Sequence, residues 1–437
     1  METAPRLIGP RYLTRFRCLG AECEDVCCVG WAVPVDPEHL VMLRRRSEES
    51  ESARALLERA IVDVPEDQRR HEGVVALMRL TLDGRCNMLE PSGLCALQSE
   101  LGEEAIPDTC ALYPRYVGQV GDRIEVSATP SCPEIARLSL LAADGTDLVP
   151  LPPTVLPRLS GSKRASPLSA DLYERRFDDV RGTVLGLLQG RQLPLASRLF
   201  FLAYLAQETN GFLHRGAVGV DEGLLDQKLG LIERPDLQAQ LHQQLTAIEV
   251  RDPFAATVTV ELILSCFGRG GPTAYRRVVE SCLGTYRGHP AEPFVVDEAG
   301  KVRLIPANLF VAWQERRPLV HARFGERLDG YLEGFARDFW FRDWYLKSAT
   351  FLDHTMGFLA RLAALRLLIA SHPLTRQAMG LEDPAAATAL VDRAAVEVVY
   401  TFTRTIDHHE SLIEGLLGTL RQGAMNTLAH AVALITF

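Results

Sequence analysis

Apolar residues recur every three to four positions through most of the chain after Asp171. Leucine, alanine and phenylalanine supply this period, which places them on one face of a helix. The pattern predicts helices over residues 171–190, 195–213, 221–249, 257–267, 271–284, 325–347, 351–371 and 386–425. Residues 293–305 break the pattern and predict a small hairpin instead. The larger part of the chain is therefore expected to be α-helical.

The first 150 residues have shorter and more varied patterns. A helix is expected over 36–59, because a proline and an acidic residue stand at its start. β-Branched and aliphatic residues over 74–82 predict a strand that leads to Cys86. Two alternating runs joined by Gly-Asp predict a hairpin over 116–128. This part is therefore expected to mix helices and strands.

Composition divides the chain into two domains and a linker. Its 437 residues are 47% hydrophobic and 24% charged, which suits a folded protein of two or three domains and excludes disorder as the main state. Proline, serine and glycine gather over 151–170, which predicts a linker. We expect a cysteine-rich α+β domain with small hairpins over 1–150 and an α-helical domain over 171–437. The fold class is then mainly α.

Charge and apolar runs narrow the range of partners. Asp and Glu number 56 against 47 Lys and Arg, so the net charge is −9, whereas nucleic-acid binding needs clustered cations. A membrane span needs about 20 apolar residues, and the best run, 358–371, is broken by Arg361 and Arg366. The N-terminus lacks an apolar signal-peptide core. We therefore expect no nucleic-acid partner, no membrane span and a cytoplasmic location.

Eight of the ten cysteines lie in the first third of the chain. Disulfides do not persist in a reducing cytosol, so a dense block of cysteines indicates metal or redox chemistry. The alternative is a set of inert core thiols, since free cysteine is common in cores. The candidate metal ligands are Cys18, Cys23, Cys27, Cys28, Cys86, Cys95, Cys110 and Cys132. The two remaining cysteines, Cys266 and Cys282, lie in helical sequence and are expected in the core.

Cysteine spacing favours an iron–sulfur cluster over zinc. The first four cysteines follow the pattern C-x4-C-x3-C-C, and the sequence has no C-x2-C pair of the kind typical of structural zinc sites. Thiolates at looser spacing hold iron–sulfur clusters. Zinc or mononuclear iron stays an alternative, and eight thiols leave open whether one cluster or two form. The C-x3-C-x2-C motif of radical S-adenosyl-L-methionine enzymes is not met, because Gly30 stands where its third cysteine would be.

Several stretches around the cysteines, together with one near the C-terminus, resemble a known family. They are YLTRFRCLGAECEDVCCVGWAVPVD at 12–36, GRC at 84–86, GLCAL at 93–97, TCALYPR at 109–115, SCPEIAR at 131–137 and FTRTIDHH at 402–409. Together they resemble the flagellin lysine-N-methylase family. The part from Cys23 to Pro114 is also similar to zinc- or iron-chelating cysteine-cluster proteins. The first resemblance implies methyl transfer from S-adenosyl-L-methionine to lysines of flagellin, by a protein that holds a 4Fe–4S cluster.

Four side chains in these stretches are candidates for binding and catalysis. Arg115 could hold a carboxylate, such as the methionine end of S-adenosyl-L-methionine, with a plain salt bridge as the alternative. Arg404 and His408 are four positions apart and share a helix face, where Arg404 is the second candidate for cofactor binding. His408 could deprotonate a lysine before attack, with a structural histidine as the alternative. Tyr113, close to Cys110, is the second catalytic candidate.

Other features leave alternatives open. The helix over 331–346 carries aromatic residues at i, i+4 spacing, which indicates core packing, with an aromatic groove for a peptide or a lysine as the rival interpretation. No G-x-G-x-x-G follows a predicted strand, so no motif locates the methyl-donor site. Besides the methyltransferase, a non-catalytic zinc- or iron-chelating protein and an electron-transfer protein remain candidates. The large helical domain favours the enzyme, because it suits recognition of a protein substrate.

Overall fold

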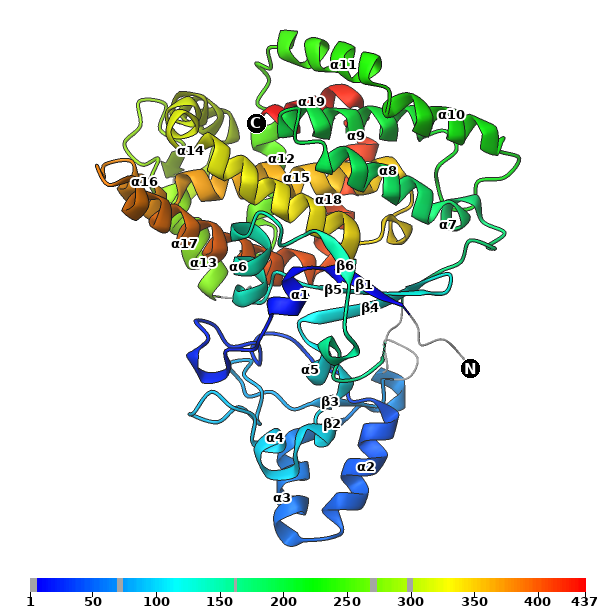
Figure 1. Cartoon of the computed structure of the whole chain (residues 1–437). Coiled ribbons are helices and arrows are strands. Elements are labelled where there is room, and N and C mark those ends of the chain that lie inside the picture. Colours follow the sequence, from blue (N-terminus) through cyan, green and yellow to red (C-terminus); the bar gives the residue numbers. More distant parts are fainter. Residues whose placement is uncertain (1–5, 69–73, 161–162, 268–272, 297–301) are drawn as a thin grey trace.

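The structure is a computed structural model that describes residues 6–68, 74–160, 163–267, 273–296 and 302–437. Figure 1 shows a large body of helices, a sheet on one side of this body, and a small lobe beyond the sheet. The fold class is mainly α with a few short strands, as the sequence predicts. Parts of three predictions, at 161–162, 271–272 and 297–301, lie outside the described residues.

The small lobe has an apolar core of its own, built from residues between Val33 and Ala111. It contains α2 (Pro37–Ser47), α3 (Glu51–Ala60), β2 (Ile61–Asp63), η2 (Glu66–Gln68), β3 (Ala76–Met78), α4 (Ala96–Leu101), η3 (Glu103–Ala105) and α5 (Asp108–Leu112). The helix predicted over 36–59 is divided, because the Ser50 hydroxyl accepts a hydrogen bond from the Ala53 amide at 3.1 Å and begins a new helix. The strand predicted over 74–82 is shorter than expected and pairs with β2.

A five-stranded sheet lies between the small lobe and the helices (Figure 1). Its order is β6–β1–β5–β4–β7, with β1 (Leu7–Pro10), β4 (Arg115–Val120), β5 (Arg123–Ala128), β6 (Leu148–Pro150) and β7 (Lys163–Ala165). β4 and β5 pair antiparallel, which confirms the hairpin predicted over 116–128. β7 lies inside the predicted linker 151–170 and pairs in parallel with β4. This segment is therefore held to the sheet, while the domain boundaries themselves stay predictions.

The short elements around the sheet connect it to the rest of the chain. They are α1 (Tyr12–Arg15), η1 (Gly20–Glu22), α6 (Pro133–Leu141) and η4 (Pro153–Val155). Tyr12 and Phe16 pack with Val126 and Ile135 into a core that is separate from that of the small lobe. The hydroxyl of Tyr12 also donates a hydrogen bond to Asp338 of the helical body at 2.6 Å. The first 150 residues therefore supply two apolar cores rather than one.

The helical body is arranged around α14 (Pro306–Arg342) and α15 (Phe351–Ser371). Its other elements are α7 (Leu172–Arg175), α8 (Phe177–Gln189), α9 (Leu195–Thr209), α10 (Glu222–Ile232), α11 (Pro235–Ala247), α12 (Phe254–Leu264), α13 (Thr273–Gly284), β8 (Phe294–Val296), β9 (Val302–Leu304), η6 (Tyr345–Lys347), α16 (Pro373–Ala378), α17 (Pro384–Phe402), η7 (Thr403–Asp407), α18 (Glu410–Gln422) and α19 (Leu428–Thr436). β8 and β9 pair antiparallel, which confirms the hairpin predicted over 293–305.

Several predicted helices have different limits in the structure, and the three largest differences have a local cause. The helix expected over 325–347 begins at Pro306 and continues through Pro318, a residue that ordinarily ends a helix. The helix expected over 221–249 is divided at Pro235, which takes the first position of α11. The helix expected over 386–425 is interrupted by η7, a π-helical turn. Proline and a local change of helix type explain each difference.

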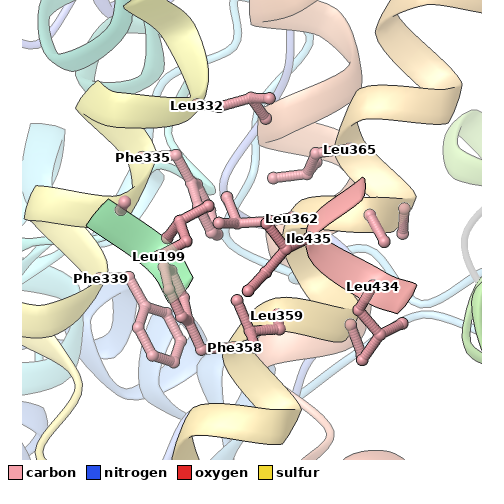
Figure 2. Packing of buried hydrophobic residues seen from close by; sticks show 14 of the residues in the cluster. Leu199, Leu332, Phe335, Phe339, Phe358, Leu359, Leu362, Leu365, Leu434 and Ile435 are labelled. Carbon is pink, nitrogen blue, oxygen red and sulfur yellow. The ribbon is translucent and has the colours of Figure 1, made fainter. Parts of the chain in front are cut away.

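The aromatic segment 331–346 lies in the core of the helical body. Tyr331, Phe335, Phe339, Trp340 and Tyr345 are each 1% exposed. Figure 2 shows Phe339 of α14 beside Phe358 of α15, with ring centroids 5.1 Å apart. The interpretation as core is confirmed, and the interpretation as an aromatic groove is wrong. Cys266 and Cys282 are buried in the same core, as predicted.

Helix α15 contains the apolar run 358–371 with its two arginines. Both side chains find polar partners inside the protein: Arg361 pairs with Asp407 at 2.8 Å, and Arg366 donates to the Ile435 carbonyl at 2.7 Å. Within the part of the chain that the structure describes, none of the helices combines the length and the apolar character that crossing a bilayer requires.

Candidate functional site

A loop that carries the first four cysteines lies against two helical elements. Arg404 of η7 donates a hydrogen bond to Asp25 at 2.6 Å. Arg137 of α6 pairs with Glu24 on the other side of the loop. Because each arginine contacts a residue next to Cys23 or close to Cys27, the two ion pairs fix the position of the thiols in this loop.

Polar and aromatic side chains from distant segments meet at Ser131, which is fully buried. The hydroxyl of Tyr113 and the Nε2 atom of His408 each lie 3.1 Å from Ser131 Oγ. The Trp31 ring lies 5.8 Å from Tyr113 and 6.1 Å from His408 between centroids, and it stacks on His408 with a 21° angle between the ring planes. Trp31 Nε1 also donates to the Cys27 carbonyl at 2.7 Å. We call Trp31, Tyr113, Ser131, Arg404 and His408 the polar cluster.

The π-helical turn η7 supplies the arginine of the polar cluster. Such turns insert one residue into a helix and are frequent at functional sites. Arg404 uses its Nη1 atom to bind Asp25, whereas its Nη2 atom is buried and has no hydrogen-bond partner among the described residues. The guanidinium also faces Tyr113, where burial raises the pKa of the phenol and the positive charge partly offsets this effect. A buried donor without a partner is costly, so this atom suits an acceptor from a ligand.

His408 is the titratable side chain that suits proton transfer in this cluster. One side of the residue is exposed to solvent. The surrounding protein nevertheless desolvates the ring and lowers its pKa, and Arg342 and Arg404 add to this effect against the opposing charge of Asp407. Because the shift is downward from about 6.5, His408 is neutral at pH 7 and can accept a proton.

Arg115 lies at the start of β4, on the side of two other cysteines. Its guanidinium packs over the Phe16 ring at 4.9 Å from the centroid. Burial lowers the pKa of Arg115, and the nearby thiols of Cys18 and Cys132 oppose this shift. Its buried Nε atom has no hydrogen-bond partner among the described residues.

The candidate cysteines are distributed over the small lobe, the cysteine loop and the N-terminus of α6. Cys86, Cys95 and Cys110 pack against the apolar core of the lobe. Cys132 immediately precedes α6 and packs against the core of the sheet layer. The Sγ atoms of Cys27 and Cys28 lie 4.0 Å apart. All eight predicted metal ligands are free thiols, and none has the full burial of Cys266 and Cys282.

The thiols differ in how readily they lose a proton. The hydrogen bond from Cys28 lowers the pKa of Cys27 to about 7, with the charge of Arg404 as a further cause. Burial raises the pKa of Cys132 to about 12, and burial also raises the pKa of Cys110. Thiolates are the form that binds metal. Cys27 is therefore ready to bind, while the buried thiols would lose their protons only as a metal enters.

The distances between the thiol sulfur atoms can be compared with those in a zinc site. Zinc bound by four thiolates at about 2.3 Å would bring the sulfur atoms to within about 3.8 Å of one another. Among the described residues, no three of the thiols come within 4.8 Å of each other. The described thiols therefore do not form a closed mononuclear zinc site as they stand. The donor set of soft sulfur ligands also fits iron–sulfur chemistry.

One group of oxygen and nitrogen ligands has its ligand atoms within 4.8 Å of one another. Asp36, His39 and Asp108 lie together in the small lobe. Arg158 occupies the same place, with Nη1 at 3.0 Å from Asp108 and 2.7 Å from His39 Nε2. The guanidinium already balances the carboxylates, so this group is explained as an ion-pair network that holds the predicted linker to the lobe.

The structure brings together three of the four predicted side chains. Tyr113, Arg404 and His408 share the polar cluster, whereas Arg115 lies beside Cys18 and Cys132. Sequence reasoning missed Ser131, although it stands next to a cysteine in a stretch that carries the resemblance. It also did not predict that Asp25 binds Arg404. Both contacts join segments more than 270 positions apart, a separation that no local pattern reveals.

Part of the chain is similar to lysine-N-methylases and to a flagellar biosynthetic protein. The chain is 28% identical to a lysine-N-methylase of Salmonella typhimurium over 139 residues, which are 32% of this chain and 33% of that protein. It is 26% identical to a lysine-N-methylase of Salmonella choleraesuis over the same length. It is 27% identical to the flagellar biosynthetic protein FliU of Salmonella muenchen, over 32% of this chain and 79% of that protein.

These matches show a distant relationship over part of the chain. The aligned region spans about a third of the length of the two lysine-N-methylases. No protein-family profile matches the chain, and no solved structure matches it. The chain is therefore similar to proteins named lysine-N-methylase over about a third of its length.

Proposed function

We propose that the chain is a protein lysine N-methyltransferase that uses S-adenosyl-L-methionine and acts on flagellin. We also propose that its N-terminal thiols bind a 4Fe–4S cluster. The observation that carries the proposal is the polar cluster beside the cysteine loop. It joins Tyr113, Arg404 and His408, which come from stretches that resemble one family at opposite ends of the chain. The names of the similar proteins support a lysine side chain as substrate and a flagellar link.

The polar cluster can solve the main chemical problem of lysine methylation. A lysine amine attacks only when neutral, and its usual pKa of about 10.4 leaves it protonated at pH 7. His408 is neutral there and can accept the proton as a general base. Ser131 holds the Nε2 side of the ring at 3.1 Å, and Trp31 holds its face. The ring is thereby oriented, and the residue is exposed to solvent, where a substrate can reach it.

Two arginines are suited to hold the methyl donor. When bound, S-adenosyl-L-methionine supplies an electrophilic methyl group on a positively charged sulfonium. Arg404 and Arg115 each keep a buried nitrogen without a partner, and a guanidinium binds a carboxylate such as that of the methionine end. Trp31 and Tyr113 offer aromatic faces beside Arg404, and such faces favour a cation. Arg404 would bind the donor next to the base, and Arg115, beside Cys18 and Cys132, is the second candidate for its carboxylate.

The thiols are suited to hold the cluster. When bound, an iron–sulfur cluster supplies one-electron chemistry or a rigid cross-link between segments. The candidates are the eight N-terminal thiols, which join the loop, the small lobe and the N-terminus of α6. A cross-link of these three parts would keep Asp25, and with it Arg404, in place.

Iron and sulfide analysis tests the cofactor part of the proposal. We expect anaerobically purified protein to be brown and to contain iron together with acid-labile sulfide. The reason is that its candidate donors are eight thiols, with no C-x2-C pair of the kind typical of structural zinc sites. Zinc without sulfide, after strictly anaerobic preparation, would overturn this part and favour the chelating protein instead.

A further inference from the structure

A pocket outside the polar cluster lies between the cysteine loop, α13 and α17. Its volume is about 400 Å³, which is within the range of ordinary ligand pockets. We call it the flanking pocket, and its polar lining includes Glu24, Asp25, Arg277, Glu397 and Tyr400. We propose that the flanking pocket binds a cationic side chain, lysine or arginine, that lies near the methylated lysine in the protein substrate. The proposal rests on the proposed function only in what it says of the substrate.

Tyr400 is a buried polar residue whose hydroxyl is available to a ligand. The residue is 9% exposed and lines the flanking pocket, and its hydroxyl has no hydrogen-bond partner among the described residues. Burial raises the pKa of Tyr400, and the nearby carboxylates of Asp25 and Glu397 raise it further. Arg404 opposes this effect, and Glu24 adds to it. The phenol is therefore protonated in a negative field, which favours a cation, and its oxygen can accept a hydrogen bond from that cation.

Glu397 supplies the carboxylate that a cation can reach. Asp25 and Glu24 already form ion pairs with arginines of the protein. The ion-pair partner of Glu397 is instead His372, at 3.5 Å, and the Glu397 side chain is 43% exposed. This contact lowers the pKa of Glu397, so the carboxylate is charged at pH 7. Glu397 and Tyr400 are three positions apart on α17 and share one face, where both can accept from one ammonium or guanidinium group.

The flanking pocket is too far from His408 to hold the methylated lysine itself. Tyr400 and His408 are eight positions apart along α17 and the turn that follows it, which corresponds to about 12 Å at the rise of a helix. An amine that meets His408 therefore leaves the pocket to another side chain of the same substrate. In an extended segment, that side chain lies about four positions from the target lysine and points to the same side.

Arg277 gives the proposal an opposite sign to test. It lines the flanking pocket from α13 and is exposed to solvent. Its positive charge repels a bound cation, so the removal of this charge should strengthen binding. If the pocket held an anion instead, Arg277 would be its main partner and its removal would weaken binding.

Binding of two labelled peptides, measured by fluorescence anisotropy without S-adenosyl-L-methionine, tests the proposal. Both peptides carry a central lysine. One has lysine four positions to either side, and the other has glutamine there. We expect the wild-type protein to bind the lysine-flanked peptide about tenfold more tightly, because a charged hydrogen-bonding group gains a carboxylate partner.

Single variants assign this preference to the flanking pocket. Glu397→Gln should reduce it to about twofold, and Tyr400→Phe should reduce it to about threefold, whereas Arg277→Gln should increase it. Glu315→Gln is the matched control and should keep the tenfold preference. It removes the same charge from a carboxylate that also contacts a histidine, at 3.0 Å, and that does not line the flanking pocket.

The outcomes separate this inference from the proposed function. Equal affinity of the two peptides for the wild type, or a preference that stays unchanged in Glu397→Gln and Tyr400→Phe, would overturn the inference. Weaker binding of the lysine-flanked peptide to Arg277→Gln would also overturn it. A preference that depends on Glu397, without methylation of the central lysine when S-adenosyl-L-methionine is added, would uphold the pocket and count against the proposed function. Circular dichroism checks that each variant folds, and the two weakening variants keep the test decisive if one of them does not.

Discussion

Replacement of Arg342 by methionine is expected to lower the free energy of unfolding by about 3–5 kcal/mol. Arg342 lies between two carboxylates, with Nε at 3.3 Å from Asp338 and Nη2 at 3.4 Å from Asp407. The side chains of Asp338 and Asp407 are 1% and 6% exposed. Methionine fills a similar volume but leaves two buried negative charges with less compensation, which is the costly way to break a buried pair.

Urea unfolding of the wild type and the variant measures this loss. Arg251→Met is the matched control, because Arg251 forms an ion pair with Glu249 at the surface and both side chains are mostly exposed. The control should unfold at the same urea concentration as the wild type. If Arg342→Met lowers the free energy of unfolding by less than about 1 kcal/mol, the expectation is wrong, because surface ion pairs contribute no more than that.

The same ion network connects the fold to the polar cluster. Asp407 also accepts a hydrogen bond from Arg361 of α15 at 2.8 Å, and it immediately precedes His408. Two buried arginines from α14 and α15 therefore hold the end of the π-helical turn. This explains why a charged residue can stand in the middle of the buried helix α15: Arg361 positions the turn that carries His408.

Replacement of His408 by glutamine is expected to lower kcat for lysine methylation by about 10²–10⁴-fold. Glutamine keeps a polar side chain of similar reach but cannot accept the proton of a lysine ammonium. His409→Gln is the matched control, because His409 is the adjacent histidine and its Nδ1 bonds to the Thr405 carbonyl in the same turn. The control should keep the wild-type kcat. A kcat within twofold of wild type for His408→Gln would remove His408 from the reaction.

The pH dependence of the methylation rate tests the same role of His408. The base form of His408 is neutral, so the rate should fall as pH decreases through the pKa of His408. Desolvation of the ring lowers this pKa, and the fall should therefore lie below about pH 6.5, the ordinary value for histidine. His408→Gln should lack this acidic limb, whereas His409→Gln should retain it. An acidic limb above pH 7 in the wild type would contradict a lowered pKa.

Local patterns in the sequence predicted the parts of the fold that depend on near neighbours. The hairpin over 116–128 follows from alternation and a Gly-Asp turn, and the burial of the aromatic segment 331–346 follows from its i, i+4 spacing. The strand β7 in the predicted linker was missed, since three residues carry no period and its partner β4 lies far away in the chain. Helix α14 was predicted too short because Pro318 is tolerated within it.

The candidate site was predictable in its residue types but not in its contacts. Cysteine density indicated a metal site, and i, i+4 spacing placed Arg404 and His408 on one face. The roles of Ser131 and Asp25 depend on tertiary contacts with those two residues, and such contacts leave no periodic signal. Tertiary packing also decides that Cys86, Cys95 and Cys110 lie against the core of the small lobe and Cys132 against the core of the sheet layer.

Mass spectrometry of flagellin after incubation with this protein tests whether the protein methylates flagellin lysines. The protein would be purified anaerobically with its metal content determined, and then mixed with flagellin and S-adenosyl-L-methionine. We predict methyl groups on flagellin lysines, no methylation without S-adenosyl-L-methionine, and a strongly reduced rate with His408→Gln. Flagellin that stays unmodified in the presence of folded protein with its full metal content would contradict the account.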